Sequence, residues 1–432
     1  MAIVAPKNST ITTSSEPASY SVPLAVVTTL FFMWGFLTCL NDILVPHLKP
    51  IFDLNYKEIM LIQFAFFGAY FVFSIPSAKV IDWIGYQRSM VVGLVTMGLG
   101  AFLFVPAASV PSYPLFLIAL IVLAAGITCL QVAANPYVTV LGEPETASSR
   151  LNLTQAFNSL GTFLAPFFGG LLILSAAPKT MTEIRALAPD ALQAYRLHEA
   201  SSVKLPYIGL GIALVLLAIV IGSFKLPKIE HAQHRVGEKV NDSIWNHRNL
   251  IFGAIGIFVY VGAEVSIGSF LVNYFTQPDI GGLTEKAAAS FVAFYWGGAM
   301  VGRFIGSGLL QKIKTGHLLG VCAVCAAALV TISMISSGHF AMWSIILVGF
   351  FNSIMFPSIF TLGVAELGPL TGDGSGVMIM AIVGGAIIPL AQGAIADRLG
   401  IHHAFFLPVI CYLYILYFAL IGSRPNSARE MA

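Results

Sequence analysis

The stretch PYVTVLG at residues 136–142 recurs as PSIFTLG at residues 357–363, with the same proline and, five residues later, the same Leu-Gly pair. A second pair, GTFLAPFFGG at 161–170 and GGAIIPLAQG at 384–393, shares the pattern G-x-x-x-x-P-x-x-x-G. The prolines of the first pair are related by an offset of 221 in the numbering, and those of the second pair by an offset of 223. Gly and Pro recur by chance in apolar helices, so either match alone is weak. Two matches at nearly the same offset indicate an internal duplication.

Composition places the chain in a membrane. Of its 432 residues, 57% are hydrophobic and 10% are charged, whereas about a quarter of the residues of a soluble domain are charged. A helix needs about 20 apolar residues to cross a bilayer. The sequence contains twelve such runs, at 22–45, 58–81, 88–108, 113–141, 151–176, 205–225, 249–275, 288–310, 318–337, 341–365, 375–396 and 403–422. These runs predict an all-α membrane protein with twelve transmembrane helices.

The duplication divides the predicted helices into two equal groups. We expect a disordered cytoplasmic tail at 1–21, an N-terminal six-helix bundle at 22–225, a cytoplasmic linker at 226–248, a C-terminal six-helix bundle at 249–423 and a cytoplasmic tail at 424–432. Parallel repeats of this kind bind their substrate near the bilayer midplane, between the halves. Twelve lysines and arginines fall on the side of the termini and eight on the other side, which predicts that both termini are cytoplasmic.

Several other classes of function lack support in the sequence. A net charge of +2 is not the strongly positive charge that indicates nucleic-acid binding. The five cysteines lie in apolar runs, and the C-x-x-C pair at 322–325 has no second pair or nearby histidine to complete a metal site. No nucleophile–base constellation indicates an enzyme. We therefore expect no enzymatic activity, no cofactor, no metal and no nucleic-acid partner.

Two carboxylates interrupt the apolar runs at matching positions. Asp42 lies in TCLNDILVPH of the first run, and Glu264 lies in YVGAEVSIG of the seventh, at an offset of 222. A charge at the bilayer centre costs at least about 2.5 kcal/mol, and such residues commonly mark the path of an ion or solute. We predict that Asp42 and Glu264 bind a coupling ion, meaning an ion whose movement across the membrane drives that of a solute. The alternative for Asp42 is a place near the outer interface, because Pro46 follows four residues later. Arg303 could neutralise Glu264 or Glu366, or lie near the cytoplasmic end of its helix.

Polar and aromatic residues recur at helical spacing within these runs. Gln131 and Asn352 are related by the offset of 221 and so occupy equivalent places in the two halves. Amides donate and accept hydrogen bonds, and aromatic faces stack on sugar rings, which suits a neutral polyhydroxylated solute. The predicted sugar-binding set is Trp34, Asn41, Gln63, Gln131, Asn135, Gln155, Asn158, Trp296 and Asn352. The alternative for each amide is a hydrogen bond between helices.

Three longer stretches carry a resemblance to a known family. They are LFFMWGFLTCLNDILVPHL at 30–48, CLQVAANPYVTVLG at 129–142 and RLNLTQAFNSLG at 150–161. These stretches resemble the fucose–galactose–glucose permease family of the major facilitator superfamily, and the similarity extends over nearly the whole chain. The resemblance implies a monomeric carrier that moves a monosaccharide inward across the bacterial inner membrane, coupled to protons or, in some members, to sodium.

The matched positions favour one branch of that family. In its fucose permeases, the aspartate matched by Asp42 and a glutamate at the position of Gln131 are the proton-sensitive acids, and a glutamine stands where this chain has Glu264. The second acid has thus moved to the other half, which favours a glucose or galactose carrier over a fucose carrier. N-acetylglucosamine carriers are an alternative. Gln155 and Asn158 match the sugar-facing positions of the fifth helix.

Together, the residues and the resemblance predict a secondary active transporter that imports an aldohexose by symport with H⁺, with Na⁺ as the alternative ion. The two halves would rock about a site at the midplane. The expected partners are a small sugar and the lipid bilayer. A membrane sugar sensor that binds without transporting is the alternative from another class.

Overall fold

The computed structural model describes residues 20–52, 56–110, 112–172, 186–202, 204–229 and 242–424. Residues 1–19 and 425–432 of the expected tails, and residues 230–241 of the expected linker, lie outside this part of the chain. The side chains of residues 40–60 lie outside it as well. The predicted site residues Asn41 and Asp42 are therefore placed on their helix, and their side chains fall outside the described part.

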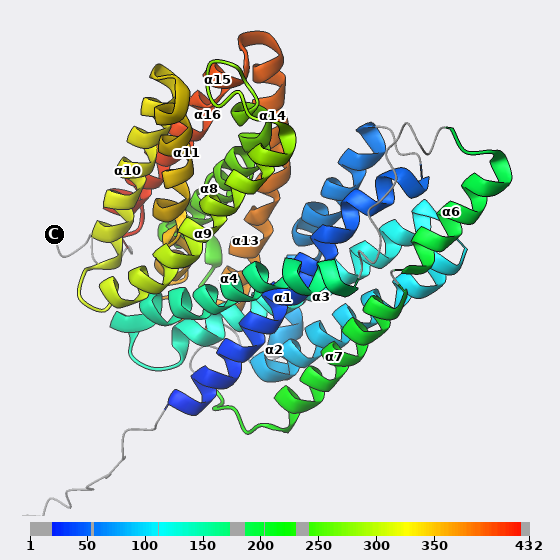
Figure 1. Ribbon diagram of the computed structural model, residues 1–432. Helices are drawn as coiled ribbons and strands as arrows, with labels where there is room; N and C mark the ends of the chain where they lie inside the picture. Colours follow the sequence, from blue (N-terminus) through cyan, green and yellow to red (C-terminus); the bar gives the residue numbers. More distant parts are fainter. Residues whose placement is uncertain are drawn as a thin grey trace, which may run out of the picture.

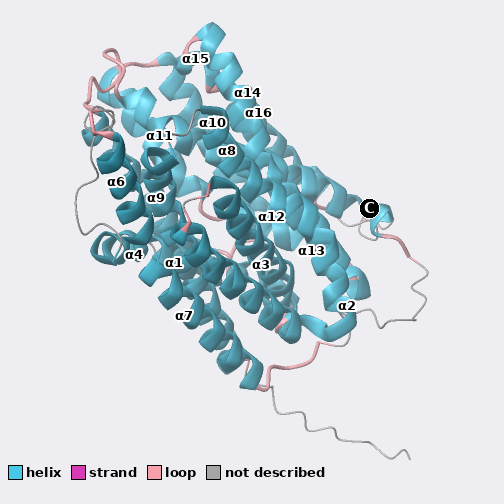
Figure 2. Cartoon of the chain, turned by 90° about the vertical axis from the view of Figure 1, so that its right-hand side faces the viewer, coloured by secondary structure: helices cyan, strands magenta, loops and turns pink. Residues whose placement is uncertain are grey.

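Every regular element in the described residues is helical (Figure 2). The N-terminal half contains α1 (Ser21–Phe52), α2 (Tyr56–Ser109), α3 (Tyr113–Val140), α4 (Ala147–Leu172), α6 (Pro189–Ser202) and α7 (Lys204–Ser223). The C-terminal half contains α8 (Arg248–Phe275), α9 (Glu285–Leu309), α10 (Thr315–Ile335), α11 (Gly338–Asn352), α12 (Met355–Gly363), α13 (Thr371–Met380), α14 (Gly384–Leu399), α15 (Ile401–Ala404) and α16 (Phe406–Tyr417). Short 3₁₀ turns and a π-helical turn at Phe418–Gly422 join or extend these helices.

The helices make twelve membrane crossings, as the sequence predicts. Ten spans are long and apolar enough to cross a bilayer. One of them, Leu61–Ser109, has 49 residues and would extend about 74 Å as a single helix, far beyond a bilayer core of about 30 Å. Gly85 divides it into two crossings, because its φ of 81° and ψ of 169° lie outside the helical region. The 26-residue helix α4 supplies the remaining crossing.

The two halves form bundles that diverge toward the top of Figure 1, where α6 and α15 lie. Because the number of crossings is even, the start of α1 and the end of α16 lie on the same side of the membrane, here called the termini side. The opposite side is called the far side. Contacts between the bundles concentrate toward the termini side, where α13 packs against α2 and α3, and α4 packs against α9 and α12.

Helix α6 has no counterpart among the helices predicted from the sequence and lies in a connection between two crossings. Its sequence PDALQAYRLHEASS begins with proline and aspartate, both of which favour the first turn of a helix. Its residues are too polar for a membrane span. The helix packs against α1, α2 and α7 and lies on the far side (Figure 1).

The run expected as a single helix at 341–365 consists of α11 and α12, which separate at Ser353 and Ile354. Pro357 has no N–H to bond the Ser353 carbonyl four residues earlier, and its ring crowds that carbonyl. The equivalent Pro136 lies inside the continuous helix α3. There the Val132 carbonyl, four residues earlier, accepts a hydrogen bond from Ser375 Oγ of the other half at 2.8 Å. Each duplicated proline therefore frees one backbone carbonyl for a side-chain donor.

Candidate functional site

Glu264 lies midway along α8 and is partly exposed. Tyr260, one helical turn earlier, donates a hydrogen bond from its hydroxyl to Glu264 Oε1 at 2.8 Å. The same hydroxyl lies 3.0 Å from the carbonyl oxygen of Asn352. The predicted ion-binding carboxyl group is thus joined, through one tyrosine, to the end of α11.

Asn352 is fully buried among three fully buried tyrosines. Its Nδ2 donates to Tyr295 Oη at 2.9 Å, and its Oδ1 accepts from Tyr412 Oη at 2.8 Å. Its carbonyl oxygen lies beside Tyr260, as described above. Both polar atoms of the Asn352 side chain are therefore occupied by neighbouring helices, which is the arrangement of the interhelical alternative for this amide.

Arg303 of α9 lies where this network meets the N-terminal half. Its Nε donates to the Ser353 carbonyl at 3.3 Å, so it pairs the carbonyl that Pro357 leaves free. Its Nη1 donates to Ser159 Oγ of α4. The structure therefore puts Arg303 beside the end of α11, where Tyr260 also bonds Glu264.

The N-terminal half carries a matching pair. Gln131 Nε2 donates to Tyr70 Oη at 2.8 Å, just as Asn352 donates to Tyr295. Gln131 and Asn352 are related by an offset of 221, and Tyr70 and Tyr295 by an offset of 225. The duplication therefore extends to the hydrogen bonds in the core of each bundle.

Three further predicted amides lie near this pair. Gln155 Nε2 lies 3.5 Å from Asn135 Oδ1, and Asn135 Nδ2 is buried with no partner among the described residues. Asn158 Nδ2 donates to the Phe31 carbonyl of α1 at 2.9 Å. Trp34 lies one turn further along α1, is largely buried, and meets the Phe31 ring edge-on at 5.4 Å.

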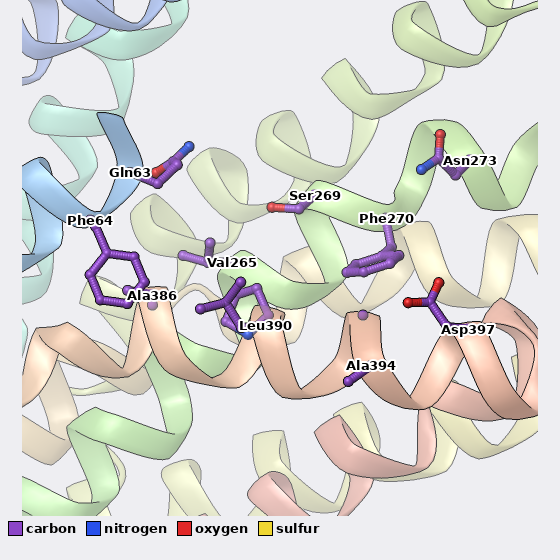
Figure 3. A pocket seen from close by; sticks show the side chains of 13 residues that line it. Gln63, Phe64, Val265, Ser269, Phe270, Asn273, Ala386, Leu390, Ala394 and Asp397 are labelled. Atoms are coloured by element: carbon purple, nitrogen blue, oxygen red, sulfur yellow. The ribbon is translucent and has the colours of Figure 1, made fainter. Parts of the chain in front are cut away.

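A cavity of about 540 Å³ opens between α2 of one half and α8 and α14 of the other (Figure 3). Gln63 lines its wall on α2, and Val265, the neighbour of Glu264, lines its wall on α8. Its other polar residues, Ser269, Asn273 and Asp397, were not predicted. The spacing of Ser269 and Asn273, four residues apart on one helix face, was the available signal.

Trp296 of α9, also predicted to contact sugar, is not among the residues that line this cavity. It is 45% exposed, meets the Tyr295 ring edge-on at 5.1 Å and packs close to Gly268. The buried tyrosines Tyr295 and Tyr412 were missed because a tyrosine in an apolar run also fits a purely hydrophobic role. No group of three His, Cys, Asp or Glu side chains that could hold a metal occurs in the described ranges.

The termini side of the interface is closed by polar contacts between the halves. Lys79 Nζ lies 2.8 Å from Asp373 of α13 and 3.3 Å from Asp82. Four further hydrogen bonds, at 2.6–2.8 Å, join Ser375 to the Val132 carbonyl, Ser148 to Thr361, Ser149 to the Ser307 carbonyl and Asn152 to the Arg303 carbonyl. With the cavity on the opposite side, these contacts show a molecule closed toward its termini side and open toward its far side.

Comparisons with known proteins agree with this geometry. The chain matches the family described as Major Facilitator Superfamily over residues 25–388. It is 53% identical to the glucose/galactose transporter of Brucella abortus biovar 1 (strain 9-941), covering 98% of this chain and 100% of that protein. It is 36% identical to the L-fucose-proton symporter of Escherichia coli (strain K12), covering 95% of each. A crystal structure of the transporter FucP in the outward conformation matches 94% of this chain and 99% of its own, with a TM-score of 0.86 and 34% identity.

Proposed function

Because the chain belongs to the major facilitator superfamily, we propose that it is a secondary active transporter that imports glucose or galactose together with H⁺. It is a multi-pass membrane transporter and not an enzyme. The names of its relatives, a glucose/galactose transporter and an L-fucose-proton symporter, support sugar symport. In this proposal it works as a monomer without a cofactor in the bacterial inner membrane, with both termini in the cytoplasm. The far side then faces outward.

The position of Glu264 is the observation that supports proton coupling. It stands midway along a membrane helix, beside a residue that lines the cavity, and it is partly exposed. A charged carboxylate is costly to enclose when the halves close over it, whereas a protonated one is neutral. Proton binding therefore removes the cost of enclosing this carboxyl group in the loaded carrier. Asp42, its equivalent in α1, is proposed as the second ion-binding acid.

The sugar site in this proposal lies between the two halves, on the termini side of the cavity. Gln131, Gln155 and Asn158 would bond sugar hydroxyls, with Trp34 stacking on the ring. The buried amide nitrogen of Asn135, which lacks a partner in the described residues, supports a polar ligand near these helices, because buried amide groups are rarely left unpaired. Binding from the outward cavity, followed by rocking of the halves, would release sugar and proton into the cytoplasm.

Uptake by purified protein in proteoliposomes tests the proposal. Labelled glucose, galactose, fucose and N-acetylglucosamine are offered separately, with an inward proton gradient, an inward sodium gradient or neither. We expect glucose or galactose to accumulate above its external concentration only with the proton gradient.

Other outcomes would replace parts of the proposal. Accumulation driven by sodium alone would make Na⁺ the coupled ion. Accumulation of N-acetylglucosamine in place of the hexoses would change the substrate. Sugar binding without flux under every gradient would contradict transport and support a sensor.

A further inference from the structure

The break between α11 and α12 leaves two backbone carbonyls that need donors from elsewhere. Asn352 is the last residue of α11, and terminal carbonyls have no donor within their helix. The Ser353 carbonyl lacks one because Pro357 has no N–H. Tyr260 and Arg303 face these two oxygens, at 3.0 Å and 3.3 Å. The break is therefore held by two side chains, and one of them, Tyr260, also bonds the Glu264 carboxyl group.

The hydroxyl of Tyr260 has two acceptors within reach, Glu264 Oε1 at 2.8 Å and the Asn352 carbonyl, but it carries only one hydrogen. When Glu264 is protonated, its O–H can donate to Tyr260 while Tyr260 donates to the Asn352 carbonyl, and all three groups are paired. When Glu264 is charged, the tyrosine hydrogen turns to the carboxylate, because charge-assisted hydrogen bonds are the stronger ones. The Asn352 carbonyl then loses its donor.

We propose that Tyr260 is a positioning residue that transmits the protonation state of Glu264 to the break between α11 and α12. This inference rests on the proposed function, in which Glu264 binds the coupled proton. The hydroxyl turns between its two acceptors and gives up no proton of its own; the proton that titrates enters and leaves through the exposed side of Glu264. Because an unpaired buried carbonyl is unfavourable, loss of the proton destabilises the present geometry of the break.

The break also contacts the N-terminal half through α9. Arg303 donates to Ser353 at the break and to Ser159 of α4, and Asn152 of α4 donates to the Arg303 carbonyl at 2.7 Å. A Cβ at Gly302 would lie 2.5 Å from Ser353 Oγ, so α9 and the break are in close contact. A change at the break therefore reaches the α9–α4 contact that helps to close the termini side.

The titratable and charged groups that face Glu264 come from two neighbouring helices and its own. They are Tyr260 of α8, Tyr295 and Arg303 of α9, and Tyr412 of α16. Helix α12, MFPSIFTLG, has no titratable residue. Those of α11, α13, α14 and α15 lie toward the two ends of the bundle. Of the facing groups, Tyr260 is the one whose hydroxyl bonds the Glu264 carboxyl group directly.

Two matched variants separate this role from simple packing. Tyr260→Phe and Tyr412→Phe each remove one fully buried hydroxyl from the Asn352 network, but only the first removes a bond to the Glu264 carboxyl group. The measurement is sugar exchange across proteoliposomes, without a gradient, from pH 5 to pH 9. We expect Tyr260→Phe to move the pH midpoint upward by about one unit, because the charged form loses the stronger bond. Tyr412→Phe should lower thermal stability and leave the midpoint in place.

A second measurement serves if Tyr260→Phe does not fold. With 3-fluorotyrosine at position 260, the ¹⁹F resonance should move with pH at the midpoint of exchange, and this pH dependence should vanish when Glu264→Gln is added. An unmoved midpoint in Tyr260→Phe, equal shifts in both variants, or a resonance constant with pH would overturn the proposal. Absence of sugar accumulation by the unmodified protein would instead contradict the proposed function, so the two failures are distinguishable.

Discussion

At the scale of single residues, the amides of this chain differ in how completely helix contacts occupy them. Asn249 is buried, and its Nδ2 lies within hydrogen-bond distance of three backbone carbonyls, at 3.0–3.2 Å. Asn158 donates to one carbonyl, that of Phe31, and is partly exposed. Asn158 therefore keeps polar surface that a sugar between the halves can bond, whereas Asn249 serves the packing of α8.

Asn158→Ala should weaken sugar binding by about 1–3 kcal/mol, because a sugar hydroxyl loses its partner. Titration calorimetry on the purified protein would measure the change in Kd. Asn249→Ala is the matched control, since it removes the same group from a site within one half; it should lower thermal stability and keep the Kd. Wild-type affinity in folded Asn158→Ala protein would mean that this amide only joins α4 to α1.

The sequence was informative for residues whose chemistry is anomalous for a membrane. Asp42 and Glu264 stood out because charge is expensive in hydrocarbon, and their offset of 222 matched the duplicated prolines. Tyr295 and Tyr412 did not stand out, because a tyrosine is unremarkable in an apolar run. Their partner Asn352 comes from another helix, and no local pattern records such a contact.

At the scale of helices, glycines set how closely α9 and α11 approach. A Cβ at Gly349 of α11 would overlap the backbone oxygen of Tyr295, so the two backbones touch at the level of the tyrosine network. Gly297 of α9, two residues beyond Tyr295, has no atom within 4 Å of the equivalent point. The same change from glycine to alanine therefore has opposite consequences at the two positions.

Gly349→Ala should destabilise the protein by about 1–3 kcal/mol, because a methyl group cannot enter a packed backbone contact without moving it. Gly297→Ala should be neutral or stabilise by up to about 1 kcal/mol, since alanine is the better helix former. Thermal unfolding in detergent, followed by size-exclusion chromatography, compares the two. Equal melting temperatures for both variants would contradict the close approach of α9 and α11.

Helices could be predicted from the sequence where the length of an apolar run determines their bounds. They were harder to predict where tertiary contacts determine those bounds. The twelve crossings followed from apolar runs. The break at Ser353 and Ile354 could not be predicted in this way. The equivalent Pro136 lies in an unbroken helix, so the presence of the proline does not decide whether the helix breaks. The two prolines free similar carbonyls, and the difference lies in what surrounds them. Helix α6 was missed because its polar sequence lies outside the membrane pattern.

At the scale of the whole molecule, the closed side and the open side are built differently. The termini side is held by hydrogen bonds and by the ion pair of Lys79 and Asp373, a partly exposed contact of the kind that contributes about 0–1 kcal/mol. On the far side, a cavity separates α2 of one half from α8 and α14 of the other. Contacts this modest allow the halves to separate once the bound sugar favours the other state.

Spin labels on each side should report this exchange. One pair replaces Phe64 of α2 and Asn273 of α8, which both line the cavity (Figure 3). The other replaces Glu145 and Lys314, which are exposed near the closed side. Addition of sugar at low pH should shorten distances in the first pair and lengthen them in the second, measured by double electron–electron resonance. Changes of the same sign in both pairs would contradict rocking of the two halves.

The central claim is that Glu264 binds the proton that drives sugar accumulation. Glu264→Gln keeps the size of the side chain and a hydrogen-bond donor toward Tyr260, but it cannot titrate. Its accumulation and its gradient-free exchange of labelled glucose or galactose, measured in the same proteoliposomes as wild type, test this claim most directly. We predict that accumulation under a proton gradient is abolished while exchange continues. Accumulation at the wild-type level would contradict the account.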